Sequence, residues 1–113
     1  MLEKWNYITL LKDFYGPLLT EKQQYIMSLY YENDLSLTEI ADDTNSTRQA
    51  VYDILRRAEN ALEDYETKLG LVKKFEFTRG YIDEAYELLN NDNINEHSVK
   101  KAIEVLRRAV ELI

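Results

Sequence analysis

Three residues of the stretch 35–57, LSLTEIADDTNSTRQAVYDILRR, stand at the intervals of a motif that holds one short helix against a nucleic acid. Ala41 is small enough for a second helix to cross closely. Asn45, four positions later, tolerates left-handed backbone because its amide can bond to local backbone groups. Val51, six positions further on, is the apolar residue that seals the pair. The spacing predicts a helix-turn-helix, whose chemistry is recognition by hydrogen bonds and charge rather than catalysis.

The second helix of this motif is expected to present seven side chains on its exposed face. Arg48 can pair bidentately with guanine and Gln49 with adenine. Thr47 can donate to a phosphate at the amino terminus of the helix, where the helix dipole also favours an anion. Each good base contact contributes roughly 1–3 kcal/mol of discrimination. The predicted nucleic-acid-binding residues are Thr47, Arg48, Gln49, Tyr52, Asp53, Arg56 and Arg57.

The charge balance of the chain points away from a protein that grips phosphates. Twenty-one acidic residues against fourteen basic ones give a net charge of −7, whereas nucleic-acid-binding domains usually present a basic face. Residues 1–70 hold thirteen acids and seven bases, so the half with the motif is the more acidic one. The predicted second helix still carries Arg48, Arg56 and Arg57 against Asp53 alone. Two partner classes therefore stay open: double-stranded DNA, or a protein or RNA for which the motif is a scaffold.

No other group of residues predicts chemistry. His97, the one histidine, stands beside Glu96 without the nucleophile that acyl transfer requires or the further ligands that zinc requires. Glu63, Asp64 and Glu66 form an acidic cluster that a solvated helix face explains. The chain has no cysteine, hence no disulfide and no thiolate ligand. We predict no catalytic residue, no metal ligand and no cofactor, and therefore no enzyme.

Seven aromatic residues between positions 5 and 31 are candidates for stacking on nucleic-acid bases. Their helical spacing is explained more simply by packing in a core. These residues are Trp5, Tyr7, Phe14, Tyr15, Tyr25, Tyr30 and Tyr31.

The composition predicts an all-α fold. Pro occurs once and Gly three times, which is too few turn residues for a sandwich of sheets, while 45% hydrophobic content can fill a core. The chain is divided into helices by a break at 16–17, capping-box patterns at Thr20 and Ser36, a carboxyl cap at Gly70 and an asparagine-rich turn at 90–93. The expected helices cover about 3–15, 20–34, 36–43, 47–69, 71–89 and 95–113.

We expect two domains. Residues 1–70 would form a helix-turn-helix domain of three or four helices that includes the long helix from residue 47, and residues 71–113 a carboxyl-terminal helical hairpin. The apolar seam of the long helix is longer than two short helices can cover. Helix-turn-helix proteins also usually pair to read two half-sites. A homodimer built through the long helix and the hairpin is therefore predicted.

Apolar residues at three- and four-residue steps predict which faces of the hairpin turn inward. Gly80, inside the first hairpin helix, costs about 1 kcal/mol relative to Ala. It therefore predicts either an interruption there or the close approach of another backbone. The predicted inward residues are Val72, Phe75, Ile82, Ala85, Tyr86 and Leu89 in the first helix and Val99, Ala102, Ile103, Leu106, Val110 and Ile113 in the second.

The order FYGPLLTEKQ, LSLTEIADDTNSTRQAVYD and LEDYETKLGL resembles the YlxM family of small bacterial proteins, and its central part is similar to region 4 of sigma factors. The resemblance spans most of the first seventy residues, and the hairpin carries no motif that adds to it. It implies a helix-turn-helix protein whose gene commonly lies beside those of the signal recognition particle GTPase and its receptor in Gram-positive bacteria. We expect a regulator in that pathway that binds DNA through residues 47–57. The alternative is a module that binds the signal recognition particle GTPase or its RNA without sequence-specific DNA binding.

The expected location is the cytoplasm, without membrane insertion. No apolar run approaches the length that crosses a bilayer. The amino terminus MLEKWNYI lacks the basic-then-apolar build of a secretion signal.

Overall fold

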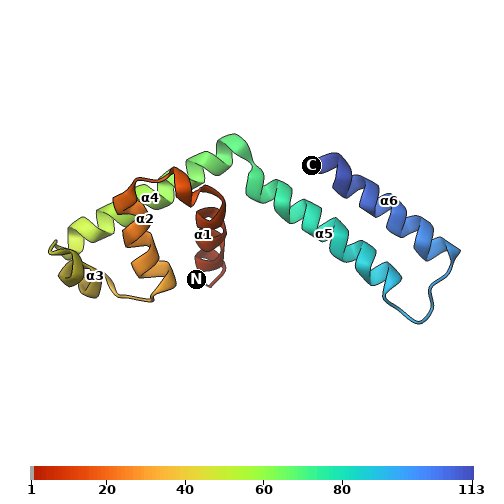
Figure 1. Cartoon of the computed structure of the whole chain (residues 1–113), viewed down its shortest axis with the longest axis horizontal. Coiled ribbons are helices and arrows are strands. Elements are labelled where there is room, and N and C mark those ends of the chain that lie inside the picture. Colours follow the sequence, from red (N-terminus) through yellow and green to blue (C-terminus); the bar gives the residue numbers. More distant parts are fainter. Residues whose placement is uncertain (1) are drawn as a thin grey trace. The chain divides into compact units, whose positions relative to one another are not determined.

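The computed structural model of the chain describes residues 2–113, which form six α-helices and no strand (Figure 1). The fold of these residues is therefore all-α, as the composition predicts. Within residues 2–113, none of the helices is both long and apolar enough to cross a membrane. The elements are α1 (Leu2–Tyr15), the 3₁₀ turn η1 (Gly16–Leu18), α2 (Glu21–Met27), the π turn η2 (Ser28–Glu32), α3 (Leu37–Thr44), α4 (Arg48–Leu69), α5 (Leu71–Leu89) and α6 (Glu96–Leu112).

The chain divides into two compact units, Met1–Gly70 and Leu71–Ile113. In the first unit, α4 packs against α1, α2 and α3. Thr20 and Ser36 start α2 and α3 with capping boxes, in which each hydroxyl accepts from a backbone amide three residues on. The buried apolar side chains of this unit are Ile8, Leu11, Tyr15, Leu19, Ile26, Met27, Leu29, Ile40, Ala41, Val51, Leu55, Ala58 and Leu62.

The long helix α4 contributes a seam of apolar residues to this core. The seam is buried at three- and four-residue steps from Val51 to Leu62, while Leu69 near the helix end is 55% exposed. Three helices pack on α4, so the unit itself covers the seam as far as Leu62. Gly70 ends the helix at φ 63°, and its N–H donates to the carbonyl of Glu66.

The second helix departs from the single α-helix that its sequence predicts. After α2 the chain continues as the π turn η2, in which the N–H of Asn33 donates to the carbonyl of Ser28, five residues back. Asp34 follows at φ 57°. Such turns are rare inside helices and are frequent at functional sites. No residue of SLYYE predicts this one from the sequence.

The second unit is a hairpin in which α5 and α6 run antiparallel, side by side (Figure 1). Asn95 starts α6, since its side-chain oxygen accepts from the N–H of Ser98 at 2.9 Å. α5 runs uninterrupted through Gly80, and a Cβ added there would meet no atom within 4 Å. Both causes predicted for Gly80 are therefore wrong for the residues that the structure describes.

The hairpin helices meet through small side chains. Ala85, Ala102 and Val105 form a buried cluster, with Tyr81 and Leu88 partly buried against it. The prediction that the large apolar residues turn inward is wrong for most of them, because the alanines let the helices approach closely and leave the neighbouring stripe outside. The outward residues, which we call the hairpin stripe, are 38% to 84% exposed. They are Phe75, Ile82, Tyr86, Leu89, Val99, Ile103, Leu106, Val110 and Ile113.

Candidate nucleic-acid interface

The turn between α3 and α4 has the backbone that the predicted motif requires. Asn45 lies at φ 53° and ψ 42°, in the left-handed region, and its N–H donates to the carbonyl of Ala41. Ala41 is 6% exposed and Val51 is 0% exposed, so the small residue and the sealing residue both lie in the core. The helix-turn-helix predicted from these three residues is confirmed.

The capping box of Ser36 and Glu39 fixes the start of α3. Ser36 Oγ accepts from the N–H of Glu39 at 3.1 Å, and Glu39 Oε1 accepts from the N–H of Ser36 at 3.0 Å. The backbone amide of Ser36, followed by its side chain, lowers the pKa of Glu39. An ionised carboxylate at the positive end of the helix dipole stabilises this first helix of the motif.

Thr47 is the N-cap of α4, and its hydroxyl oxygen accepts from the N–H of Ala50 at 3.0 Å. The hydroxyl hydrogen remains available as a donor. The N–H groups of Arg48 and Gln49, in the first turn, have no acceptor within the helix. The cap is therefore compatible with the predicted phosphate contact at Thr47.

All seven residues predicted to contact nucleic acid are exposed. Gln49 Nε2 donates to Asp53 Oδ1 at 3.0 Å, which leaves the Gln49 carbonyl oxygen and one amide hydrogen for a base edge. The three arginines outnumber Asp53, and none of them forms an ion pair with another residue of the described range 2–113. The α4 face therefore carries net positive charge in an acidic unit. It consists of Thr47, Arg48, Gln49, Tyr52, Asp53, Arg56 and Arg57.

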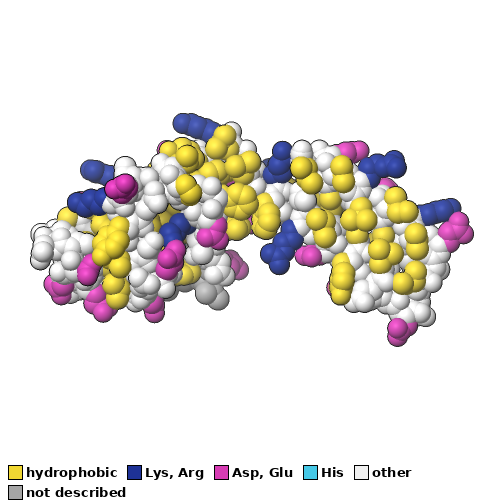
Figure 2. Space-filling model, viewed as in Figure 1, with side chains coloured by type: hydrophobic (Ala, Val, Ile, Leu, Met, Phe, Trp, Pro, Cys, Tyr) yellow, Lys and Arg dark blue, Asp and Glu magenta, His cyan; other side chains and the backbone are white. Residues whose placement is uncertain are grey.

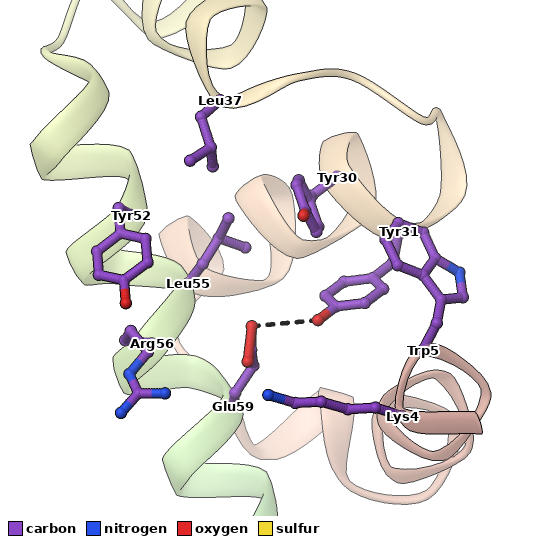
Figure 3. A pocket seen from close by; sticks show the side chains of 9 residues that line it. All are labelled: Lys4, Trp5, Tyr30, Tyr31, Leu37, Tyr52, Leu55, Arg56 and Glu59. Atoms are coloured by element: carbon purple, nitrogen blue, oxygen red, sulfur yellow. Dashed lines mark hydrogen bonds between the residues drawn. The ribbon is translucent and has the colours of Figure 1, made fainter. Parts of the chain in front are cut away.

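A pocket of about 320 Å³ opens beside this face, between α1, η2 and α4 (Figure 3). Tyr52 and Arg56 belong both to the pocket and to the α4 face. The buried side chain of Leu55 forms part of the lining. The full lining consists of Lys4, Trp5, Tyr30, Tyr31, Leu37, Tyr52, Leu55, Arg56 and Glu59.

Three aromatic rings form one side of the pocket. The ring centroid of Trp5 lies 5.3 Å from that of Tyr30 and 4.5 Å from that of Tyr31, and the two tyrosines are 5.0 Å apart. Neighbours in an α-helix point about 100° apart, and the π turn brings both tyrosines against one indole. The Tyr31 hydroxyl donates to Glu59 Oε2 at 3.1 Å. Burial, and then Glu59, raise the pKa of Tyr31, so the hydroxyl stays protonated as a donor.

The pocket is not predicted by the sequence patterns. Helical spacing assigns Trp5, Tyr30 and Tyr31 to a core, but all three are only half-buried. Tyr7 and Tyr25, assigned to the same core, are 39% and 52% exposed. Neighbours in a regular helix point about 100° apart, and SLYYE carries no signal for the π turn that brings both rings to Trp5.

The other side chains considered for chemistry do not assemble into a site. His97 is exposed, and no group of three His, Cys, Asp or Glu residues within 2–113 could hold a metal ion. Glu63 and Asp64 are exposed on α4. Glu66 accepts from the Tyr15 hydroxyl at 2.5 Å, so it links α4 to α1 instead of joining the acidic cluster.

The turn at Asn45 and the exposed α4 face place this chain in the class of small helix-turn-helix proteins. The chain matches, over residues 2–105, the model of the UPF0122 family, described as helix-turn-helix protein, YlxM / p13 like. The chain belongs to this family, and the resemblance predicted from its residues is confirmed.

Curated relatives support this membership along the whole chain. A UPF0122 protein of Desulforamulus reducens is 45% identical over 112 residues, which cover 97% of this chain and 96% of the relative. A UPF0122 protein of Bacillus mycoides is 43% identical over 108 residues, covering 96% and 98%. One from Listeria welshimeri is 43% identical over 107 residues, covering 95% and 97%.

Proposed function

We propose that this protein is a regulator that binds double-stranded DNA through the α4 face. One observation carries the proposal: the α4 face of a helix-turn-helix exposes three arginines against one carboxylate, Asp53. Helices in this position lie in the major groove and read bases with their amino-terminal residues. The proposal includes the regulation of the signal recognition particle pathway that the family resemblance implies.

The order of residues along α4 suggests how the contacts are shared. Arg48 and Gln49 stand in the first turn and would read base edges. Thr47 and the free amides of that turn would hold a phosphate. Arg56 and Arg57, two turns further along, would contact the phosphate backbone and fix the register.

Salt-dependent binding of the full chain to DNA fragments tests this function. Arg48→Ala with Arg57→Ala should weaken binding at least tenfold and lower the salt slope by about one, because a base contact at Arg48 and a phosphate contact at Arg57 are lost. Lys22→Ala with Lys68→Ala removes the same charge from exposed sites off this face and should leave binding nearly unchanged. Equal effects of the two double variants would show that net charge, and not the α4 face, governs binding.

A homodimer is part of the same proposal, and the hairpin stripe supports it. Figure 2 shows apolar side chains gathered along the hairpin. The stripe of α6 recurs at three- and four-residue steps, from Val99 through Ile103, Leu106 and Val110 to Ile113. That is the pattern of a helix packed against another helix. The nine stripe residues are 38% to 84% exposed, and contiguous exposed apolar surface of this kind marks interaction sites.

A second copy of the hairpin fits this surface. Two hairpins packed stripe to stripe would make a four-helix bundle with two-fold symmetry, in which the same patch is used by both chains. Sedimentation of the full chain at micromolar concentration should give a dimer. Ile103→Gln with Val110→Gln should give a monomer, while Lys101→Gln with Arg108→Gln, on the polar side of α6, should remain a dimer. A monomeric parent chain would rule the homodimer out.

The acidity of the first unit favours a second candidate function. A protein-interaction module that binds the signal recognition particle GTPase would use electrostatic complementarity between its acidic surface and a basic surface of the GTPase. The RNA is itself an anion, so this acidity favours the GTPase over the RNA as the partner. Glu63 and Asp64 are exposed on α4 and suit this role. Glu63→Lys with Asp64→Lys should weaken association with the purified GTPase and leave DNA binding intact or stronger. Unchanged association would exclude that surface.

A further inference from the structure

The pocket between α1, η2 and α4 combines three kinds of side chain. It has aromatic walls, one carboxylate and two cations. Its volume of about 320 Å³ lies at the lower end of the range of roughly 300–1,000 Å³ for small-ligand pockets. A ligand of the size of one nucleotide suits it better than a longer one.

The aromatic walls suit a flat ring. Trp5, Tyr30 and Tyr31 pack together on one side, and Figure 3 shows Tyr52 across the pocket from Tyr31. Tyr52 is 45% exposed, so part of its ring is accessible to a ligand. Stacking of a nucleobase on an aromatic side chain contributes about 1–3 kcal/mol per base and needs only a π-face.

Glu59 adds a directional requirement. Its carboxylate points toward the middle of the pocket (Figure 3) and is oriented by the hydrogen bond that Oε2 receives from the Tyr31 hydroxyl. A carboxylate can only accept hydrogen bonds, so Oε1 calls for N–H donors on the ligand. Guanine offers two adjacent donors, at N1 and N2, whereas adenine and cytosine offer one amino group and uracil one imino group. Glu59 therefore favours guanine.

Lys4 and Arg56 favour an anionic group on the ligand of this pocket. Both line the pocket, and neither forms an ion pair with another residue of the range 2–113. Two cations against one carboxylate oppose a cationic ligand, which an aromatic cage would otherwise attract. They suit the phosphate of a nucleotide whose base lies between the aromatic rings.

From these contacts we infer that the pocket binds one guanine nucleotide: the base stacks on the aromatic walls and donates to Glu59, and the phosphate lies near Lys4 and Arg56. A free mononucleotide and an unpaired guanosine in a nucleic acid strand present the same chemistry. The inference does not depend on duplex binding by the α4 face. Because Tyr52 and Arg56 belong to both, a bound nucleotide would change that face directly.

Trp5 is the single tryptophan of the chain, so the tryptophan fluorescence comes from a residue that lines this pocket. The full chain is titrated with GMP, AMP, CMP and UMP, and with short single-stranded RNAs that differ only in a central G or U. Free N-acetyltryptophanamide corrects for the light that the nucleotides absorb. GMP or the G-containing strand should quench Trp5 saturably, with at least tenfold weaker binding of the other ligands.

Matched variants decide whether the quenching comes from the proposed contacts. Glu59→Gln should weaken guanine binding at least tenfold, while Glu63→Gln, one turn along α4 and exposed, should bind as the parent chain does. Tyr31→Phe keeps the ring, loses the bond to Glu59 and should give an intermediate loss. Circular dichroism verifies that each variant is folded.

Each outcome of the titrations is decisive. Quenching by GMP identifies a free nucleotide, and quenching by the G-containing strand alone identifies an unpaired guanosine. Absence of quenching by both, or a Glu59→Gln variant that binds as well as the parent, overturns the inference. Duplex binding is scored separately through Arg48 and Arg57, neither of which lines the pocket, so the two proposals can fail independently.

Discussion

The Tyr31 hydroxyl on the π turn η2 donates a hydrogen bond of 3.1 Å to Glu59 Oε2 on α4. This bond ties the irregular end of the second helix to α4, the helix that carries the α4 face. Trp5 of α1 packs on the same tyrosine ring, with 4.5 Å between the ring centroids. The pocket is therefore bordered by a contact that also holds three elements of the first unit together.

Ionisation of Tyr31 should destabilise the folded chain at alkaline pH. Burial, and then the Glu59 carboxylate, raise the pKa of Tyr31 above the value of about 10 that tyrosine has in an unfolded chain. The folded state thus holds this proton more tightly than the unfolded state does. The stabilisation is complete below about pH 10 and is lost as the pH rises from there toward the higher folded pKa. Urea unfolding at about pH 8 and at about pH 11 measures the loss.

Two tyrosine variants provide the controls for this pH dependence. Tyr31→Phe should cost about 1 kcal/mol at pH 8 and should lose less further stability at pH 11 than the parent chain. Tyr25→Phe should keep most of the alkaline loss of the parent chain. The hydrogen bond to Asp43 also raises the pKa of Tyr25, but this pair lies at the surface, where solvent screens it. An equal alkaline loss in Tyr31→Phe and in the parent would assign the effect to other groups.

Substitution of Asn45 should reveal the left-handed turn of the motif. A β-branched residue is strained at φ 53°, so Asn45→Val should lower the free energy of unfolding by about 1–2 kcal/mol. Asn45→Gly should be neutral or slightly stabilising, because glycine adopts this conformation without strain. Asn60→Val, at an exposed helical position of α4, should change stability by less than about 0.5 kcal/mol. Urea unfolding of the three variants gives the comparison.

Alanine substitutions at Gly70 and Gly80 should change the stability of the folded chain in opposite directions. Gly80 is helical and faces open space, so Gly80→Ala should stabilise the hairpin by about 1 kcal/mol. Gly70 is at φ 63°, where a Cβ is strained whatever the space around it. Gly70→Ala should therefore destabilise by about 1 kcal/mol. Thermal unfolding checks both signs, and a destabilising Gly80→Ala would mean that another backbone approaches this site in solution.

The sequence patterns predict the parts of the fold that local chemistry determines. The side-chain cap of Ser36, the left-handed Asn45 and the carboxyl-terminal Gly70 each act within a few residues, so spacing alone locates them. The π turn is not predicted, because no local signal for it stands in SLYYE and its two tyrosines pack on Trp5, which is far away in sequence. The pocket is not predicted either, since the hydrogen bond from Tyr31 to Glu59 depends on the position that the π turn gives Tyr31.

The hairpin illustrates a second limit of periodicity. Along α6 two apolar stripes lie side by side, one of small residues and one of large residues. Periodicity detects both but does not say which of them packs on the neighbouring helix. The close approach allowed by Ala85 and Ala102 settles the choice within the hairpin. The hairpin stripe of large residues stays exposed in the single chain. It supports the proposed homodimer more directly than the helix-turn-helix motif does.

Pairing through the hairpin stripe should make thermal stability depend on protein concentration. Anything that binds the folded chain and not the unfolded one stabilises it by mass action, and a hundredfold excess over the dissociation constant contributes about 2.7 kcal/mol. The unfolding midpoint of the full chain should therefore rise by several degrees between about 1 µM and about 100 µM protein. Ile103→Gln with Val110→Gln should remove this dependence, whereas Lys101→Gln with Arg108→Gln should retain it. A midpoint that stays constant in the parent chain over this range would show that the stripe is not covered by a second copy.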